Sequence, residues 1–252
     1  MTDTPSRGCG ACRDGRALDF PISMAFQPIV DLRTGRPWAY EALVRGAEGE
    51  AAASVLARVT PENRYAFDQQ CRVAAIEGAV AAGLLETGAR LSINFLPNAV
   101  YSPKACIQLT LRTAQATGLP TDRLMFEFTE NERMADPAHV LEIVQSYREM
   151  GFTTALDDFG AGYAGLGLLA RFQPDVIKLD MALLRGVDAS EPRRMIVDAM
   201  VGLCRRLGVT VIAEGIETRG ELDAVRALGI ELVQGYLLAK PAFEALPEPV
   251  LA

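Results

Sequence analysis

Eight short apolar segments of this chain end at, or next to, a polar side chain that can bind a metal ion or a phosphate. They read MAFQPIV, WAYEALV, LSIN, LMFE, TTALDD, VIKLD, TVIAE and IELVQ, and six of them are separated by stretches long enough to hold a helix. Parallel strands that alternate with helices bring their carboxyl ends to one mouth of a barrel. The repetition therefore predicts a barrel with one site assembled at that mouth.

The first two segments, around residues 23–30 and 38–45, are expected to pair in an antiparallel way. Only DLRTGRP joins them, whereas a parallel crossover needs a dozen residues or more. The later segments alternate with helical patterns, which predicts parallel βα units. The predicted fold class is α/β, a TIM-like (β/α)8 barrel whose first strand is reversed.

Start and stop signals define the helices between these segments. The predicted helices run from Thr60-Pro61 to near Gly83, from Asp136-Pro137 to Gly151, from Ser190 to Gly208, and from Thr218 to Gly229. In the last of them, Thr218 and Glu221 have the spacing of a capping box. The βα rhythm is thus supported by signals that are independent of hydropathy.

The rest of the chain is consistent with one enzyme-sized domain over residues 21–252, preceded by a flexible tail over 1–20. The tail contains Cys9 and Cys12, but a zinc ribbon needs further ligands, and the one histidine is His139 in a predicted helix. The tail has no apolar region typical of a signal peptide, and no stretch is long enough to span a membrane. We therefore expect a cytoplasmic location, and the net charge of -7 argues against a nucleic-acid polymer as partner.

Six polar residues at the predicted strand ends can form a metal site: Glu41, Asn94, Glu127, Asp157, Asp158 and Glu214. Their carboxylates would repel one another in a partly desolvated site unless cations were bound. All the ligands are oxygen atoms, which favours Mg²⁺ or Mn²⁺ over zinc. Asp157 and Asp158 are adjacent, so both can face one site only if the strand ends there and the chain turns.

Two neighbouring ions are suited to the hydrolysis of a phosphodiester, because together they activate water and stabilise negative charge in the transition state. Lys178, in VIKLD, is placed to orient that water, and Asp180 shares its face of the strand. Any one of these carboxylates alone would be read as a solvated strand end or a surface ion pair. The repetition at matching positions favours a site.

The chain resembles the EAL-domain proteins of bacterial cyclic di-GMP signalling. The resemblance extends over about residues 22–244 and rests on ordered motifs: FQPIVD, YEALVRG, FDQQC, LSINF, FEFTE, LDDFGAGYAGL, VIKLD, VIAEGIE and QGYLLAKP. It implies hydrolysis of cyclic di-GMP to linear pGpG with two Mg²⁺ or Mn²⁺ ions. It also implies a homodimer.

The resemblance assigns a role to each matching position. The first ion would be held by Glu41, Asn94, Glu127 and Asp157, and the second by Asp157, Asp158 and Glu214. Lys178 would contact the nucleophilic water, so that the residues expected to be catalytic are Lys178, Glu41 and Glu214. The positions expected to bind substrate are Gln27, Arg45, Asp180, Glu217 and Gln234. Glu130 would stabilise the loop that follows Asp157 and Asp158.

Some positions depart from the family pattern, although no expected metal ligand is lost. Ala161, Ala164 and Gly165 replace larger or hydroxyl-bearing residues, and Gly46 stands where many members have tryptophan. The extra glycine is expected to make the loop more mobile. Two alternatives remain open: a catalytically weak or inactive module that binds cyclic di-GMP or a protein, and a barrel hydrolase for another phosphodiester.

Overall fold

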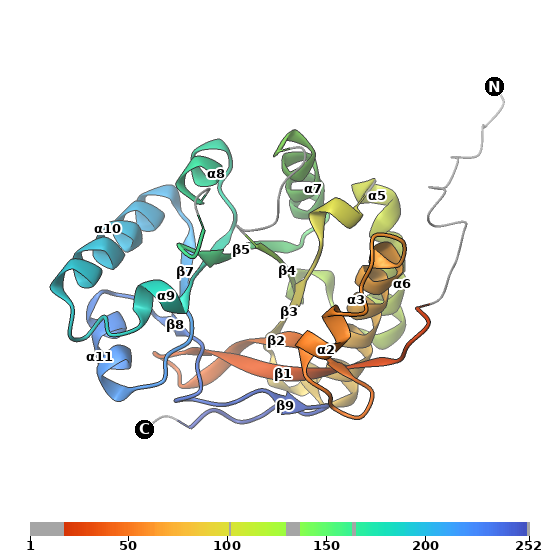
Figure 1. Ribbon diagram of the computed structural model, residues 1–252, viewed down its shortest axis with the longest axis horizontal. Coiled ribbons are helices and arrows are strands. Elements are labelled where there is room, and N and C mark those ends of the chain that lie inside the picture. Colours follow the sequence, from red (N-terminus) through yellow and green to blue (C-terminus); the bar gives the residue numbers. More distant parts are fainter. Residues whose placement is uncertain (1–17, 101, 130–136, 163–164, 251–252) are drawn as a thin grey trace.

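The computed structural model describes residues 18–100, 102–129, 137–162 and 165–250, and its core is a barrel of eight strands with helices outside (Figure 1). The sheet order is β2-β3-β4-β5-β6-β7-β8-β1-β9, and an additional pairing of β1 with β2 closes the barrel. The strands are β1 Ile22–Asp31, β2 Arg36–Gly46, β3 Arg90–Asn94, β4 Leu124–Thr129, β5 Thr153–Phe159, β6 Val176–Leu179, β7 Thr210–Ala213, β8 Leu232–Val233 and β9 Ala242–Phe243.

The reversed first strand is confirmed. β1 pairs antiparallel with both β2 and β8, whereas successive strands from β2 to β8 are parallel. The register between β1 and β2 places Gln27 directly opposite Glu41. Because β1 runs in the opposite direction, Gln27 reaches the barrel mouth from the middle of its strand.

Helices surround the barrel in the positions that the βα rhythm predicts (Figure 1). They are α2 Ala52–Leu56, α3 Arg64–Ala81, α4 Leu84–Thr87, α5 Pro103–Cys106, α6 Gln108–Thr117, α7 Pro137–Glu149, α8 Gly165–Arg171, α9 Met181–Leu184, α10 Glu191–Leu207 and α11 Arg219–Ala227, with short 3-10 turns at Pro97–Ala99 and Thr121–Arg123. The capping box of Thr218 and Glu221 is present at the start of α11.

One helix start was predicted too early. The helix expected from Thr60-Pro61 begins at Arg64, because residues 60–63 form a turn instead. In this turn the Thr60 backbone N–H donates to Asn63 Oδ1 at 2.7 Å, and Asn63 Nδ2 donates to the carbonyl of Arg58 at 2.9 Å. The asparagine side chain thus closes a turn in front of the helix. The Arg64 N–H then donates to the carbonyl of Thr60 at 3.0 Å.

The barrel interior has an apolar layer directly below a polar one. Most of its apolar members lie two residues from a polar residue of the mouth, as in Ala39 and Glu41, or Met125 and Glu127. Since alternate strand residues share a face, both members of such a pair point inward. The apolar layer consists of Ile29, Ala39, Met125, Ala155, Val176, Ile212 and Leu232. A larger apolar cluster lies between the barrel and the helices.

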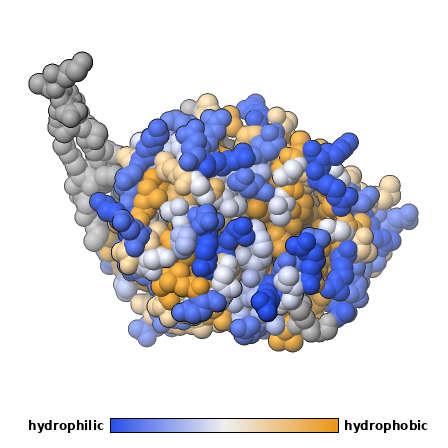
Figure 2. All heavy atoms as spheres, turned by 180° about the vertical axis from the view of Figure 1, so that it is seen from behind, coloured by the Kyte–Doolittle hydropathy of each residue, from blue (hydrophilic) through white to orange (hydrophobic). Residues whose placement is uncertain are grey.

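The boundary of the domain at residue 21 stays a prediction, but the packed region already includes Phe20. Its side chain is 4% exposed, and the Arg58 guanidinium lies 3.9 Å from the centre of its ring. Cys9, Cys12, Glu130 and Ala164 lie outside the described residues. Among the described helices, none is both long and apolar enough to cross a membrane. The face in Figure 2 carries separate hydrophobic patches between hydrophilic areas.

Candidate active site

Lys178 on β6 lies at the centre of the polar layer, fully buried among four carboxylates. Its Nζ is 2.8 Å from Glu127 Oε2, 2.8 Å from Glu214 Oε1, 3.0 Å from Asp157 Oδ1 and 3.3 Å from Glu41 Oε2. These side chains come from β2, β4, β5, β6 and the end of β7. Residues far apart in the sequence therefore meet at one barrel mouth, as the segment pattern predicts.

Glu41 is held by amide side chains. Asn94 Nδ2 donates to Glu41 Oε1 at 3.0 Å, and Gln234 Nε2 donates to Glu41 Oε2 at 2.7 Å. Gln234 Nε2 also lies 3.2 Å from Gln27 Oε1, and Gln27 Nε2 donates to the carbonyl of Ala239 at 3.1 Å. Gln27 and Gln234 thus belong to the hydrogen-bond network that orients a proposed metal ligand.

Ser92 is a site residue that the sequence reasoning missed. It is fully buried on β3, and its hydroxyl donates a short hydrogen bond to Glu127 Oε1. The other oxygen of Glu127 contacts Lys178. Ser92 lies two residues before Asn94, so its place on the same face of the strand as an expected metal ligand was the available signal.

Asp157 and Asp158 reach one site by a different route from the one expected. Strand β5 continues to Phe159 with a shift in its pairing to β6 between Leu156 and Phe159, so the two aspartates form a bulge. Asp158 has φ of 54°, in the left-handed region that aspartate tolerates better than most residues. The bulge turns Asp158 toward the mouth without ending the strand.

The buried charges shift one another's ionisation. Burial raises the pKa of Glu127 to about 8, with Glu41 and Asp157 adding to the rise and Lys178 opposing it. Burial likewise raises the pKa of Asp158 to about 6 and that of Glu214 well above its usual value. Burial alone would lower the pKa of Lys178, but the surrounding carboxylates raise it well above its usual value. One ammonium group is too little positive charge for this cluster.

The donor set fits divalent cations. Two groups of carboxylates have ligand atoms within 4.8 Å of one another, and they share Asp157. The first contains Glu41, Glu127 and Asp157, and the second contains Asp157, Asp158 and Glu214. Among the described residues, buried Asp157 Oδ1 has no hydrogen-bond donor of good geometry, although Lys178 lies close to it. Such an arrangement of oxygen atoms suits Mg²⁺ or Mn²⁺.

A cavity of about 340 Å³ opens above these groups. It contains Asp180 and Glu217, which the sequence analysis expected to contact substrate, together with Met181 and Tyr236, which it did not single out. The full lining consists of Gln27, Glu41, Asp158, Asp180, Met181, Glu214, Gly215, Glu217, Gln234, Gly235 and Tyr236. The side chain of Glu217 is fixed by Arg185 Nη2, which lies 2.8 Å from Glu217 Oε1.

Arg45 is not among the residues lining this cavity. Its guanidinium donates to the carbonyl of Val44 at 2.7 Å, within its own strand. The substrate-binding role expected for Arg45 therefore has no contact in this conformation to support it. The other expected ligand, catalytic and substrate-binding residues in the described ranges lie together at the mouth.

Comparison with known proteins links this site to one family. The EAL domain profile matches residues 19–241. A standalone versatile EAL protein from Vibrio cholerae O395, solved in its c-di-GMP-bound form, is 49% identical with a TM-score of 0.89, covering 93% of this chain and 98% of its own.

Two curated relatives match at lower identity. BluF of Escherichia coli, a blue light- and temperature-regulated antirepressor, is 35% identical over 88% of this chain and 55% of its own length. The cyclic di-GMP phosphodiesterase PA2567 of Pseudomonas aeruginosa is 32% identical over 89% of this chain and 38% of its own length. The chain thus spans about half or less of each of these longer relatives.

Proposed function

This chain belongs to the EAL-domain family, and we propose that it hydrolyses cyclic di-GMP to linear pGpG with two Mg²⁺ or Mn²⁺ ions. The observation that carries the proposal is the pair of carboxylate groups that share Asp157 around one buried lysine. The similarity to a c-di-GMP-bound EAL protein and to a cyclic di-GMP phosphodiesterase supports the choice of substrate.

In this proposal Glu41, Asn94, Glu127 and Asp157 hold the first ion. Asp157, Asp158 and Glu214 would hold the second, so that Asp157 belongs to both groups of ligands. When bound, the ions would supply positive charge at the scissile phosphate and lower the pKa of the attacking water. Ser92 keeps Glu127 in place, while Asn94 and Gln234 fix the orientation of Glu41.

The residues of the chain supply positioning and charge. A water oxygen attacks phosphorus and loses a proton, one ring P–O bond breaks, and the departing ribose oxygen takes up a proton, so that one water is added overall. Lys178 Nζ, held by four carboxylates, contributes an ammonium group where negative charge develops. Asp180, Glu217 and Gln234 line the cavity in which the rest of the substrate would be bound, and Gln27 orients Gln234.

A hydrolysis assay tests the proposal. Purified protein with Mg²⁺ or Mn²⁺ is expected to convert cyclic di-GMP to pGpG, and Glu41→Ala is expected to abolish turnover by removing a metal ligand. Glu231→Ala is the matched control, because Glu231 is an exposed glutamate just before β8, at the other end of the barrel. Unchanged turnover in Glu41→Ala would refute the site assignment.

The alternative is an EAL module that binds cyclic di-GMP or a protein partner without catalysis. The antirepressor BluF, at 35% identity, is the observation that keeps this alternative in view. It is distinguished by the same assay: binding of cyclic di-GMP without product formation in either metal would favour it. The intact set of carboxylates around Lys178 favours the enzyme.

We also propose that the chain forms a homodimer through the surface of α8 and α10. Leu166 on α8 and Met195, Ile196 and Leu207 on α10 are exposed hydrophobic residues. Hydrophobic side chains exposed on neighbouring elements can be covered by a partner in protein–protein contacts. Light scattering on protein eluting from a size-exclusion column is expected to give twice the chain mass of 27.2 kDa. The Ile196→Glu variant should instead have the mass of the monomer.

A further inference from the structure

A buried ion pair on α3 has no part in the chemistry proposed above. Asp68 and Arg72, one turn apart, have side-chain exposures of 1% and 0%, and Arg72 Nη2 lies 2.7 Å from Asp68 Oδ2. Gln69 Nε2 donates to the same oxygen at 3.2 Å. Removing two charges from water costs free energy that apolar side chains of similar size do not cost. A contribution to stability is therefore a weak explanation for the presence of this buried pair.

Asp68 determines where strand β3 ends. The Phe95 backbone N–H still donates to the carbonyl of Glu127, but the Leu96 N–H donates to Asp68 Oδ1 at 2.9 Å. The chain thus leaves the sheet at Leu96, two residues after Asn94, where a carboxylate from α3 accepts the backbone N–H on the side opposite to β4. This fixes the backbone that carries a proposed metal ligand.

Arg72 contacts the outer side of the ends of β3 and β4. Its guanidinium carbon lies 5.5 Å from the ring centres of Phe95 and Phe126, and its Nη1 donates to the Tyr147 hydroxyl at 3.0 Å. Phe95 follows Asn94, and Phe126 precedes Glu127. Since neighbouring strand residues face opposite sides, fixing these rings outside the barrel fixes the two ligands inside it.

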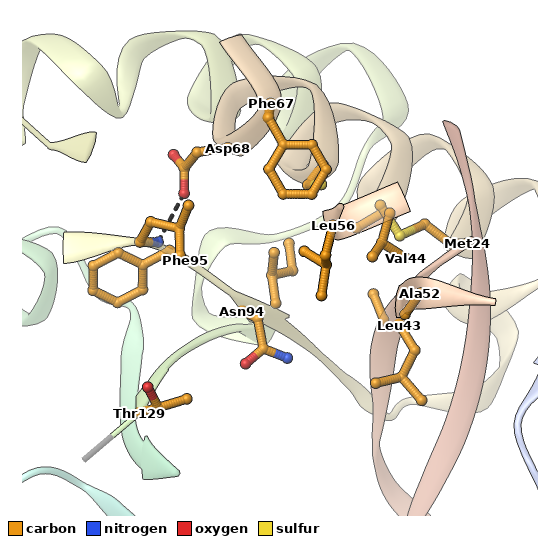
Figure 3. Close-up of a pocket in the computed structure, with 15 residues that line it drawn as sticks. Met24, Leu43, Val44, Ala52, Leu56, Phe67, Asp68, Asn94, Phe95 and Thr129 are labelled. Atoms are coloured by element: carbon orange, nitrogen blue, oxygen red, sulfur yellow. Dashed lines mark hydrogen bonds between the residues drawn. The ribbon is translucent and has the colours of Figure 1, made fainter. Parts of the chain in front are cut away.

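The other side of this loop is not closely packed. A cavity of about 450 Å³ lies between α2, α3 and the ends of β2 and β3, and both Asp68 and Asn94 line it. In Figure 3, Asp68 reaches the backbone after Phe95 through the dashed hydrogen bond, with Leu56 and Val44 on the opposite wall and Asn94 at the edge. If the hydrogen bond is lost, the loop has room to move.

We propose that Asp68 and Arg72 are positioning residues for the metal site, holding the ends of β3 and β4 so that Asn94 and Glu127 stay in register. The inference rests on the proposed metal-dependent function. Removing the pair should weaken metal binding even in protein that is fully folded. Groups hydrogen-bonded directly to ligating side chains typically change metal affinity by about 10–100-fold when they are removed. Asp68 and Arg72 act through the Leu96 N–H and the neighbouring rings, so an effect at the lower end of this range is expected.

The decisive variant is Asp68→Leu/Arg72→Met, which removes both charges together and leaves neither one unpaired in the core. Its dissociation constant for Mn²⁺, measured by calorimetry, is expected to rise by about 10-fold. Hydrolysis should then need more Mn²⁺ but recover as the metal saturates. Asp68→Asn keeps the shape but weakens the acceptor and leaves the Arg72 charge without its partner, so its Mn²⁺ affinity should also fall below that of the wild type. It decides the question if the double variant does not fold.

The control is Asp175→Leu. Asp175 Oδ2 accepts the Thr154 N–H at 2.9 Å just before β6, at the opposite end of the barrel. This variant should lose stability in EDTA but bind Mn²⁺ as the wild type does. Wild-type Mn²⁺ affinity in the folded Asp68 variants would overturn the inference. A wild-type protein that binds no Mn²⁺ would instead refute the proposed function, and the inference with it.

Discussion

Replacing Lys178 by methionine tests the charge balance of the site. The substitution keeps a side chain of similar length but removes the ammonium group that contacts four buried carboxylates. Breaking a buried ion pair by removing one partner costs about 3–5 kcal/mol. In a domain of this size 1 kcal/mol lowers the melting temperature by about 2–4 °C, so a decrease of roughly 6–20 °C is expected in EDTA.

The size of this decrease should depend on pH. Burial raises the pKa of Glu127 to about 8, so its carboxyl group is mostly protonated at pH 6 and mostly ionised at pH 9. Lys178 stabilises the ionised form, and its contribution therefore grows as pH rises through about 8. The variant should lose least stability at pH 6 and most at pH 9.

Divalent cations should reduce the difference between the two proteins. At 100 times its dissociation constant, a ligand of the folded state adds about 2.7 kcal/mol of stability. Without Lys178 the carboxylates attract cations more strongly, so the variant should gain more from Mn²⁺ than the wild type does. Differential scanning fluorimetry measures each value, with exposed Lys104→Met as the control. An equal difference in EDTA and in saturating Mn²⁺ would refute this reasoning.

Three further predictions address the site and its support. Asp158 and Glu127 must be ionised to bind a cation, and burial raises their pKa values to about 6 and about 8. Mn²⁺ affinity should therefore rise from pH 5 to pH 9. Calorimetry in buffers of different ionisation enthalpy should detect the protons that are released on binding. Thr218→Ala removes the hydroxyl that accepts the Glu221 N–H and should cost about 1 kcal/mol in urea unfolding without changing turnover. Deleting residues 1–17 should leave hydrolysis intact, whereas a deletion that includes buried Phe20 should also cost about 1.5–3 kcal/mol of stability.

The barrel could be predicted because its strands repeat one inward-facing pattern. Ala155 and Asp157, or Ile212 and Glu214, are two residues apart, so most strands contribute one apolar and one polar side chain to the interior. Strand β3 is the exception, because both Ser92 and Asn94 are polar. Chain connectivity then determined that the first strand is reversed. Local alternation and loop length are both properties of short segments, and for this reason they can be read without the structure.

The features that sequence reasoning missed depend on contacts between distant segments. The bulge at Asp158 arises where β5 pairs with β6, and no local signal specifies its positive φ. The hydrogen bond from the Leu96 N–H to Asp68 joins the end of β3 to α3, and the motif FDQQC does not by itself reveal this partner. The substrate-binding role expected for Arg45 stays a prediction; in this structure its guanidinium donates to the carbonyl of Val44.

The two buried glutamines acquire a more specific role from the reversed strand. Because β1 is antiparallel, Gln27 lies opposite Glu41 and accepts from Gln234 Nε2, which also donates to Glu41. Gln234 Nε2 is thereby committed to orienting a proposed metal ligand. In the described part of the chain Gln234 Oε1 is buried without a hydrogen-bond partner. An unsatisfied acceptor costs free energy unless a donor arrives, so this oxygen is suited to receive an N–H of bound substrate. One amide would then connect substrate binding to the orientation of Glu41.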